Sequence, residues 1–295
     1  MRRVIAHLVG GLGNQLFVYA AAWAFAQRTG ADLILDISAF KRDARYRRTY
    51  ALDCFNLGDV TLRDGAWAAE FIHRQYYRAR VLLPLLPPRL GPIVGERSPV
   101  QHEPLSADLL RSFASVHVCG YRQNEAYFAD QARALRQKLA FVFAPSEEAR
   151  AQADAIRAGN AVGVHVRQLL HVRAGGTEPD PHIRQLDETY YHAAIAAMRR
   201  RVPDARFFCF ADTLAGLDRF LPPGIDKVVP KATNDARADV RDLWLMTHCR
   251  HFIIANSSFS WWGAWLGARP GSIVLCPDTR GFEYRIAPAR GWEVI

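Results

Sequence analysis

At 295 residues and 33.2 kDa, the chain is about twice the common domain length of roughly 150 residues, which excludes a lone small binding module. Half of its residues are hydrophobic and 23% are charged, a balance that excludes a disordered chain and predicts a sizeable core. The net charge of +9 at pH 7 comes from 34 arginines and 4 lysines against 29 acidic residues, and a basic surface favours anionic partners.

The sequence predicts a cytoplasmic protein. Its longest apolar stretch, residues 16–26, is shorter than the about 20 apolar residues that cross a bilayer. The Met-Arg-Arg start lacks the plan of a signal peptide. Single cysteines without metal-ligand spacing predict buried thiols, not a metal site or disulfides. They are Cys54, Cys119, Cys209, Cys249 and Cys276.

The N-terminal segment predicts one βαβ unit. An apolar run at residues 4–9 predicts a strand, and residues 10–15, Gly-Gly-Leu-Gly-Asn-Gln, predict a glycine loop. Residues 16–28 predict a buried helix that Gly30 ends in the left-handed conformation. Residues 32–36 predict the next strand.

The glycine loop is a candidate ligand site, because a strand end followed by a helix start presents free amides and the helix dipole to an anion. A dinucleotide fingerprint would place a third glycine at position 16, which is Leu16. Asp36 nevertheless stands where a ribose-binding acid would be. A ligand-free tight turn and an NAD-linked oxidoreductase therefore stay open as alternatives.

The middle of the chain is less regular. Residues 41–97 are basic and dotted with prolines, and the apolar run at 81–88 predicts a hydrophobic loop packed under the domain. The arginines around this run also suit a peripheral contact with the inner-membrane surface. A strand at 115–120 and helices at 124–139 and 146–158 follow.

The second half alternates strands with helices, which is typical of a parallel sheet covered by helices. We expect an N-terminal α/β domain at 1–150, a C-terminal α/β domain at 151–295 and a cleft between them. The expected strands of the second half are 161–167, 206–210, 251–255 and 272–276, and its helices are 189–201, 238–249 and 259–267.

Three strand ends of the second half carry residues suited to a nucleotide, although a structural role is open for each. Arg167, near His165, would hold a phosphate or pair with a surface acid. Asp212 would accept two N–H bonds from a guanine edge or cap a helix. The segment Asn256-Ser257-Ser258-Phe259 joins hydroxyls to a helix start, which suits a pyrophosphate, while the tryptophans after it suit a core.

Several of these motifs together resemble the α-1,2-fucosyltransferases of glycosyltransferase family 11. They are Gly-Gly-Leu-Gly-Asn-Gln-Leu-Phe at 10–17, Gly-Tyr-Arg-Gln-Asn-Glu-Ala-Tyr-Phe at 120–128, His-Val-Arg at 165–167, Tyr190-Tyr191 and residues 253–266. Their order and spacing agree with the family over nearly the whole chain.

The resemblance implies a GT-B fold of two facing Rossmann-like domains around a central cleft, with GDP-fucose as donor, inversion at the anomeric carbon, no metal and no cofactor. It implies that Arg167 holds the β-phosphate as a catalytic residue and that Asn14 faces the reaction centre as another. The donor-binding residues that it implies are His165, Asp212, Asn256, Ser257, Ser258, Phe259, Gly11, Gly13 and Gln15. The acceptor would be a galactose-type hydroxyl of a glycan; no nucleic-acid partner is expected, because the arginines are dispersed.

Two positions depart from the family's pattern. The family continues His-x-Arg with Arg-Gly-Asp-Tyr, where this chain has Gln168-Leu169-Leu170-His171. The Ser-Asp-Asp of related fucosyltransferases is Ala211-Asp212-Thr213 here. A different donor sugar and a non-catalytic nucleotide-sugar-binding protein therefore stay open. His171, Glu178 and Asp187 are candidates for a general base that the sequence does not rank.

Overall fold

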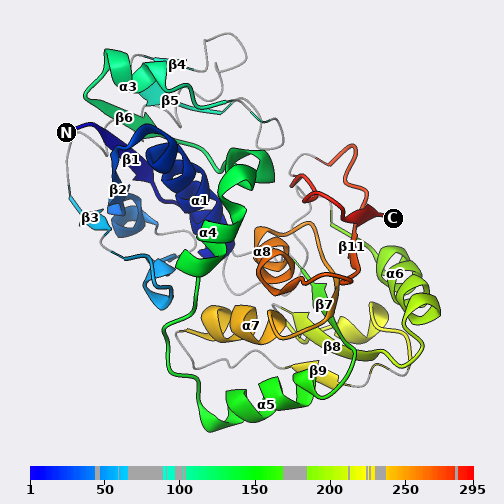
Figure 1. The fold of residues 1–295 in the computed structure, drawn as a ribbon. Helices are drawn as coiled ribbons and strands as arrows, with labels where there is room; N and C mark the ends of the chain where they lie inside the picture. Colours follow the sequence, from blue (N-terminus) through cyan, green and yellow to red (C-terminus); the bar gives the residue numbers. More distant parts are fainter. Residues whose placement is uncertain are drawn as a thin grey trace. The chain divides into compact units, whose positions relative to one another are not determined.

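The computed structural model describes residues 1–43, 47–58, 60–65, 89–90, 92–96, 102, 104–168, 185–211, 213–223, 225, 227–229, 237–282 and 285–295. The chain divides into two compact units, Met1–Val142 and Phe143–Ile295, each an α/β structure (Figure 1). The division precedes the expected boundary at residue 150, because helix α5 (Glu147–Arg157) packs against α7 (Ala238–Met246) of the second unit.

The first unit is built on a six-stranded sheet with the order β3-β2-β1-β6-β5-β4. Its neighbouring strands run parallel except for the β4–β5 pair, which is antiparallel. The strands are β1 (Arg3–His7), β2 (Asp32–Asp36), β3 (Thr61–Arg63), β4 (Arg89–Leu90), β5 (Ile93–Val94) and β6 (Ser115–Val118). The predicted N-terminal βαβ unit is therefore present, and the region at 41–97 adds short strands that the sequence pattern did not indicate.

Helix α1 (Leu12–Thr29) packs on β1 and β2 and is buried along nearly its whole length. Gly30 ends it with φ 63° while its N–H donates to the carbonyl of Ala26, as predicted. The start was predicted wrongly, because the helix begins at Leu12 and not after Gln15. Gly11 caps it in an extended conformation, and its carbonyl accepts from the amides of Asn14 and Gln15. The expected glycine loop is thus partly the first turn of α1.

The helix expected at 124–139 is shorter than predicted. The structure has two 3-10 turns, Glu125–Tyr127 and Ala129–Gln131, and then α4 (Ala132–Lys138). The side chain of Asn124 accepts from the amide of Ala126, which favours a local turn over a continuous helix. A short helix, α3 (Asp108–Ser112), precedes β6.

The second unit carries a six-stranded parallel sheet with the order β12-β11-β10-β7-β8-β9. In chain order this is the 3-2-1-4-5-6 arrangement of a Rossmann fold. Its strands are β7 (Ala161–Val166), β8 (Arg206–Ala211), β9 (Lys227–Val229), β10 (His251–Ile253), β11 (Val274–Cys276) and β12 (Glu293–Val294). The four predicted strands are present, with β10 and β11 shorter than expected.

Helices α6 (Glu188–Arg201) and α8 (Ser258–Gly267) join α5 and α7 in this unit, close to their predicted bounds. Glycine permits the close packing of α7 with α8. A Cβ on Gly267 would lie 2.9 Å from backbone atoms of Thr247, just past the end of α7. Trp261, Trp262 and Trp265 are buried against one another, so these three tryptophans belong to the core.

The sheet order fixes where a ligand would bind. Strands β7 and β10 are neighbours in the sheet. The connection after β7 leads to β8 on one side, and the connection after β10 leads to β11 on the other. This reversal is the switch point at which open α/β sheets hold ligands, outside the carboxyl ends of the strands. Residues directly after Val166 and Ile253 therefore define the candidate site.

All five cysteines are buried free thiols, as predicted. Among the described helices, none is both long enough and apolar enough to span a membrane. The apolar run at 81–88, on which the membrane contact was based, lies outside the described residues.

Candidate functional site

The end of β7 provides two of the predicted residues. His165 is the fifth residue of the wholly buried strand and is 4% exposed, while Arg167 follows the strand and is half-buried. Burial and the neighbouring Arg167 guanidinium lower the pKa of His165 to about 3, so its imidazole is neutral at pH 7. Its Nδ1 is buried without a hydrogen-bond partner. A buried polar atom without a partner is uncommon, which marks this position at the end of the strand as one that needs an explanation.

The end of β10 brings the third predicted motif to the same place. The ring of Phe259, in the first turn of α8, lies 5.2 Å from the ring of His165 between centroids. Ser257 caps α8 in an extended conformation with no side-chain bond to the helix amides. The amides of Ser258, Phe259 and Ser260 belong to the first turn and have no carbonyl within the helix to bind. Side chains of β7 and α8 that are far apart in sequence thus meet beside a helix start suited to an anion.

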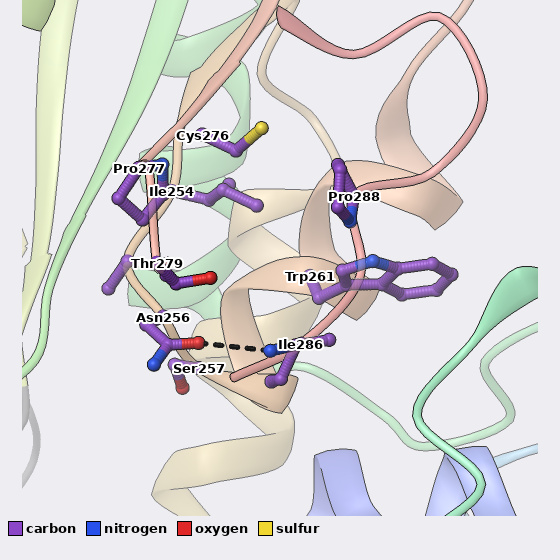
Figure 2. A pocket seen from close by; sticks show the side chains of 10 residues that line it. Ile254, Asn256, Ser257, Trp261, Cys276, Pro277, Thr279, Ile286 and Pro288 are labelled. Atoms are coloured by element: carbon purple, nitrogen blue, oxygen red, sulfur yellow. Dashed lines mark hydrogen bonds between the residues drawn. The ribbon is translucent and has the colours of Figure 1, made fainter. Parts of the chain in front are cut away.

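Asn256 has a structural contact that the sequence did not predict. Its Oδ1 accepts the amide N–H of Ile286 at 3.2 Å (Figure 2). The indole N–H of Trp261 donates to the carbonyl of Ala287 at 2.9 Å. These two bonds fix the segment 286–288 beside the start of α8.

A small pocket of about 20 Å³ opens between this segment and the ends of β10 and β11 (Figure 2). Its lining is Ile254, Ala255, Asn256, Ser257, Trp261, Cys276, Pro277, Thr279, Ile286 and Pro288. The lining is mainly apolar, and it includes Ser257, which directly precedes α8. The pocket therefore adjoins the start of α8.

The loop after β8 is tied to the end of β7. The side-chain amide of Gln168, which is 5% exposed, donates to the carbonyl of Ala215 at 3.0 Å. Thr213 Oγ1 accepts the amide of Ala215. Gln168, the first residue that departs from the family pattern, is thus a buried connection between two loops of the site.

The structure separates the remaining candidates. Asp212, His171 and Glu178 lie outside the described residues. Asp187 is exposed and accepts the amide N–H of Tyr190 as the cap of α6, so its carboxylate has a structural use. No general base is identified among the described residues.

Gln15 was predicted to bind the donor, and the structure contradicts this. Its side chain is fully buried; Nε2 donates to the carbonyls of Gly10 and Thr49, and Oε1 accepts the amide of Ala51. All of its polar atoms are used within the first unit, so it holds the 49–51 segment against α1. The prediction failed because these partners are distant in sequence.

The other predicted residues of the glycine segment differ in access. Gly11 is half-buried, and Gly13 is buried in the first turn of α1. Asn14 is half-buried, and its Oδ1 accepts the side-chain amide of Gln123 at 2.9 Å. Gly10 has φ 74°, and a Cβ there would meet the Asn14 side chain at 2.7 Å. Asn14 is therefore held between the loops that leave β1 and β6.

Sequence reasoning missed a buried arginine beside this loop. Arg122 is 0% exposed and donates to the carbonyls of Val94 and Cys119. Glu96 accepts the backbone amides of Tyr121 and Arg122. The positive φ of Arg122, 53°, turns the chain just before Gln123. The only sequence signal was the arginine itself inside an otherwise family-like motif.

Asp36 does not present a carboxylate to a ribose. It is 1% exposed, and its Oδ1 accepts from the hydroxyl and the amide of Ser38. This burial removes the residue on which the NAD alternative depended. Among the described residues, no three His, Cys, Asp or Glu side chains gather as a metal site would require.

Two Rossmann-like sheets, one with a switch point beside a helix start, define the class as a GT-B-like fold. Residues 110–287 match the profile of Glycosyl transferase family 11. The chain belongs to this family of glycosyltransferases, as the sequence motifs predicted.

Two curated proteins of Escherichia coli are similar to this chain along most of its length. The alpha-1,2-colitosyltransferase is 29% identical over 290 residues, covering 96% of this chain and 93% of that protein. The O-antigen biosynthesis glycosyltransferase WbnK is 27% identical over 291 residues, covering 92% of each.

Solved structures share the fold at low sequence identity. The NodZ alpha-1,6-fucosyltransferase soaked with GDP-fucose matches with a TM-score of 0.52 at 20% identity, covering 96% of this chain and 97% of that chain. A variant of Arabidopsis thaliana FUT1 in complex with GDP matches with a TM-score of 0.51 at 11% identity, covering 93% and 70%. The predicted GT-B-like fold class is therefore confirmed.

Proposed function

We propose that this chain is an inverting glycosyltransferase that moves L-fucose from GDP-fucose to a galactose-type hydroxyl in α-1,2 linkage. The acceptor is a surface glycan or its oligosaccharide precursor, and the reaction is cytoplasmic. The observation that carries the proposal is the meeting of His165 and Phe259 beside the start of α8, with Arg167 at the same sheet edge.

The proposed chemistry follows from where charge develops. When GDP leaves the anomeric carbon, negative charge builds on the β-phosphate. The guanidinium of Arg167 and the first-turn amides of α8 stabilise this charge more in the transition state than in the ground state. Ser257 and Ser258 donate hydroxyl hydrogen bonds to the pyrophosphate.

His165 contributes as a neutral group in this proposal. A second cation at its buried position would be costly beside Arg167, which is why the pKa of His165 is low. Its neutral ring packs on Phe259 and supports that residue beside the start of α8. Asp212 reads the guanine, and Asn14 and Gly11 contribute to the reaction.

The similar proteins support GDP as the nucleotide and a fucose-like sugar as the group that is transferred. One related fold was soaked with GDP-fucose and another was solved with GDP. The 29% identical relative is an alpha-1,2-colitosyltransferase, and colitose is the 3-deoxy analogue of fucose. Attack by the acceptor hydroxyl on the face opposite GDP would invert the anomeric configuration.

A second candidate keeps the fold and the nucleotide but changes the sugar to colitose. The similarity to the colitosyltransferase favours it, as does Gln168, which replaces the arginine of the family pattern with a neutral, buried amide. A protein that binds a GDP-sugar without transferring it is the remaining alternative.

The test is calorimetric titration with GDP, GDP-fucose, GDP-colitose, GDP-mannose, UDP-galactose and NAD, with chelator present. Transfer to a β-galactoside is then followed, and the linkage is read by NMR. Tight binding of GDP and GDP-fucose with an α-1,2 product is the expected result. A preference for GDP-colitose would favour the second candidate, and binding without transfer or hydrolysis would favour the third.

A further inference from the structure

The pocket at the ends of β10 and β11 has no role in the chemistry described so far. We propose that it receives the C6 methyl group of the donor sugar and so selects 6-deoxyhexoses. This inference rests on the proposed function and names the part of the donor that the site recognises.

The position of the pocket suits a sugar on the β-phosphate. Ser257 lines the pocket and also directly precedes the first-turn amides of α8, the proposed pyrophosphate site. Trp261, one turn further along α8, lines the pocket as well. A hexose joined to a phosphate at the start of α8 therefore lies within one sugar's reach of the pocket.

The size of the pocket selects a small group. A cavity that holds one water needs about 10–15 Å³ on the same measure, and this pocket measures about 20 Å³. It accommodates one methyl-sized group, while a hydroxymethyl group adds a further heavy atom. Its apolar lining, with Ile254, Ile286 and Pro288, favours a methyl over a polar substituent.

The walls of the pocket are fixed before any ligand arrives. Asn256 binds the amide of Ile286, and the indole of Trp261 binds the carbonyl of Ala287. The thiol of Cys276 donates to the carbonyl of Glu293, so its hydrogen is already in use. Making room for a hydroxymethyl group would require the walls that these contacts hold to shift, so we expect the selection to be steric.

The test compares three GDP-sugars that differ only at C5. GDP-D-arabinopyranose has a hydrogen there, GDP-L-fucose a methyl and GDP-L-galactose a hydroxymethyl. Binding is measured by calorimetry with GDP as reference. We expect GDP-L-fucose to bind about fourfold more tightly than GDP-D-arabinopyranose, which is the value of one buried methyl group. We expect GDP-L-galactose to bind at least tenfold more weakly than GDP-L-fucose.

Two variants locate the effect at the pocket. Ile286→Ala enlarges the pocket and should bring GDP-L-galactose to within about threefold of GDP-L-fucose without changing the affinity for GDP. Ile273→Ala, a matched control at a half-buried isoleucine outside the pocket, should keep the wild-type ratios. The comparison of donors with the wild-type protein needs no variant and stands even where a variant fails to fold.

Failure of this inference is distinguishable from failure of the proposed function. Equal affinities of the wild-type protein for the three GDP-sugars, with tight binding of GDP, would overturn the methyl pocket and leave the GDP site intact. Unchanged ratios in Ile286→Ala would overturn it as well. Absence of GDP binding would overturn the proposed function and this inference together.

Discussion

Replacing His165 with asparagine should reduce the loss of stability that this protein suffers on acidification. His165 is 4% exposed, and burial together with the Arg167 guanidinium lowers its pKa to about 3. In the unfolded chain its pKa returns to an ordinary value of about 6.5. Between these values the unfolded state binds a proton that the folded state does not. The contribution of neutral His165 to the free energy of unfolding is therefore fully present above pH 6.5, and it is lost as the pH falls from 6.5 toward 3.

The size of the effect follows from the two pKa values. At pH 5 the unfolded histidine is protonated while the folded one stays neutral, which favours unfolding by about 2 kcal/mol relative to pH 7. Asparagine does not titrate, so His165→Asn should show a fall that is smaller by this amount. His117 and His248, whose pKa values are also lowered, are present in both proteins and cancel in the difference.

The assay is urea denaturation of both proteins at pH 7 and pH 5, followed by tryptophan fluorescence. This signal reports mainly on the second unit, which contains Trp244, Trp261, Trp262, Trp265 and Trp292 out of the chain's seven tryptophans. Equal falls in the free energy of unfolding for the wild type and the variant would refute the buried, neutral state of His165.

Three further predictions concern the charge at the strand edge, the helix contact and the glutamine of α1. Arg167→Ala should lower kcat about 10²- to 10³-fold with an unchanged melting temperature, because it removes transition-state stabilisation; near-normal turnover would contradict its role. Gly267→Ala should destabilise the protein by about 1–3 kcal/mol in thermal unfolding, since its Cβ would lie 2.9 Å from the backbone of Thr247. Gly159→Ala is the control and should cost much less, because the nearest atom to its Cβ would be 3.5 Å away, an ordinary contact distance. Gln15→Ala should lower the melting temperature, because it leaves the buried amide of Ala51 without its partner, and keep the affinity of the folded protein for GDP; a selective loss of GDP affinity would restore the ligand role.

Local patterns were enough to predict much of the second unit. The apolar run at 161–167 and the apolar run before Asn256 were enough to predict β7 and β10, the two neighbouring strands at the switch point. The hydroxyl-rich start of α8 placed Ser257 and Phe259 correctly at the edge. These features depend on residues close in sequence, so composition and periodicity carry them.

The errors lie where a side chain serves a partner far along the chain. Gln15 looked available because Thr49 and Ala51 are not near it in sequence. Arg122 was not singled out from the sequence, because the backbone carbonyls that surround it come from separate loops. Such environments form only in the folded structure, and no local pattern predicts them.

The 3-2-1-4-5-6 order of the second sheet has a consequence for how such a protein changes during evolution. The residues proposed to touch the donor stand at or just beyond strand ends, whereas β7 and β8 are filled with side chains that pack against the protein itself. A lineage can therefore exchange one sugar for another through a few substitutions in the loops after β7, β8, β10 and β11. The core that makes the chain fold need not change, so a new sugar specificity does not require a new fold.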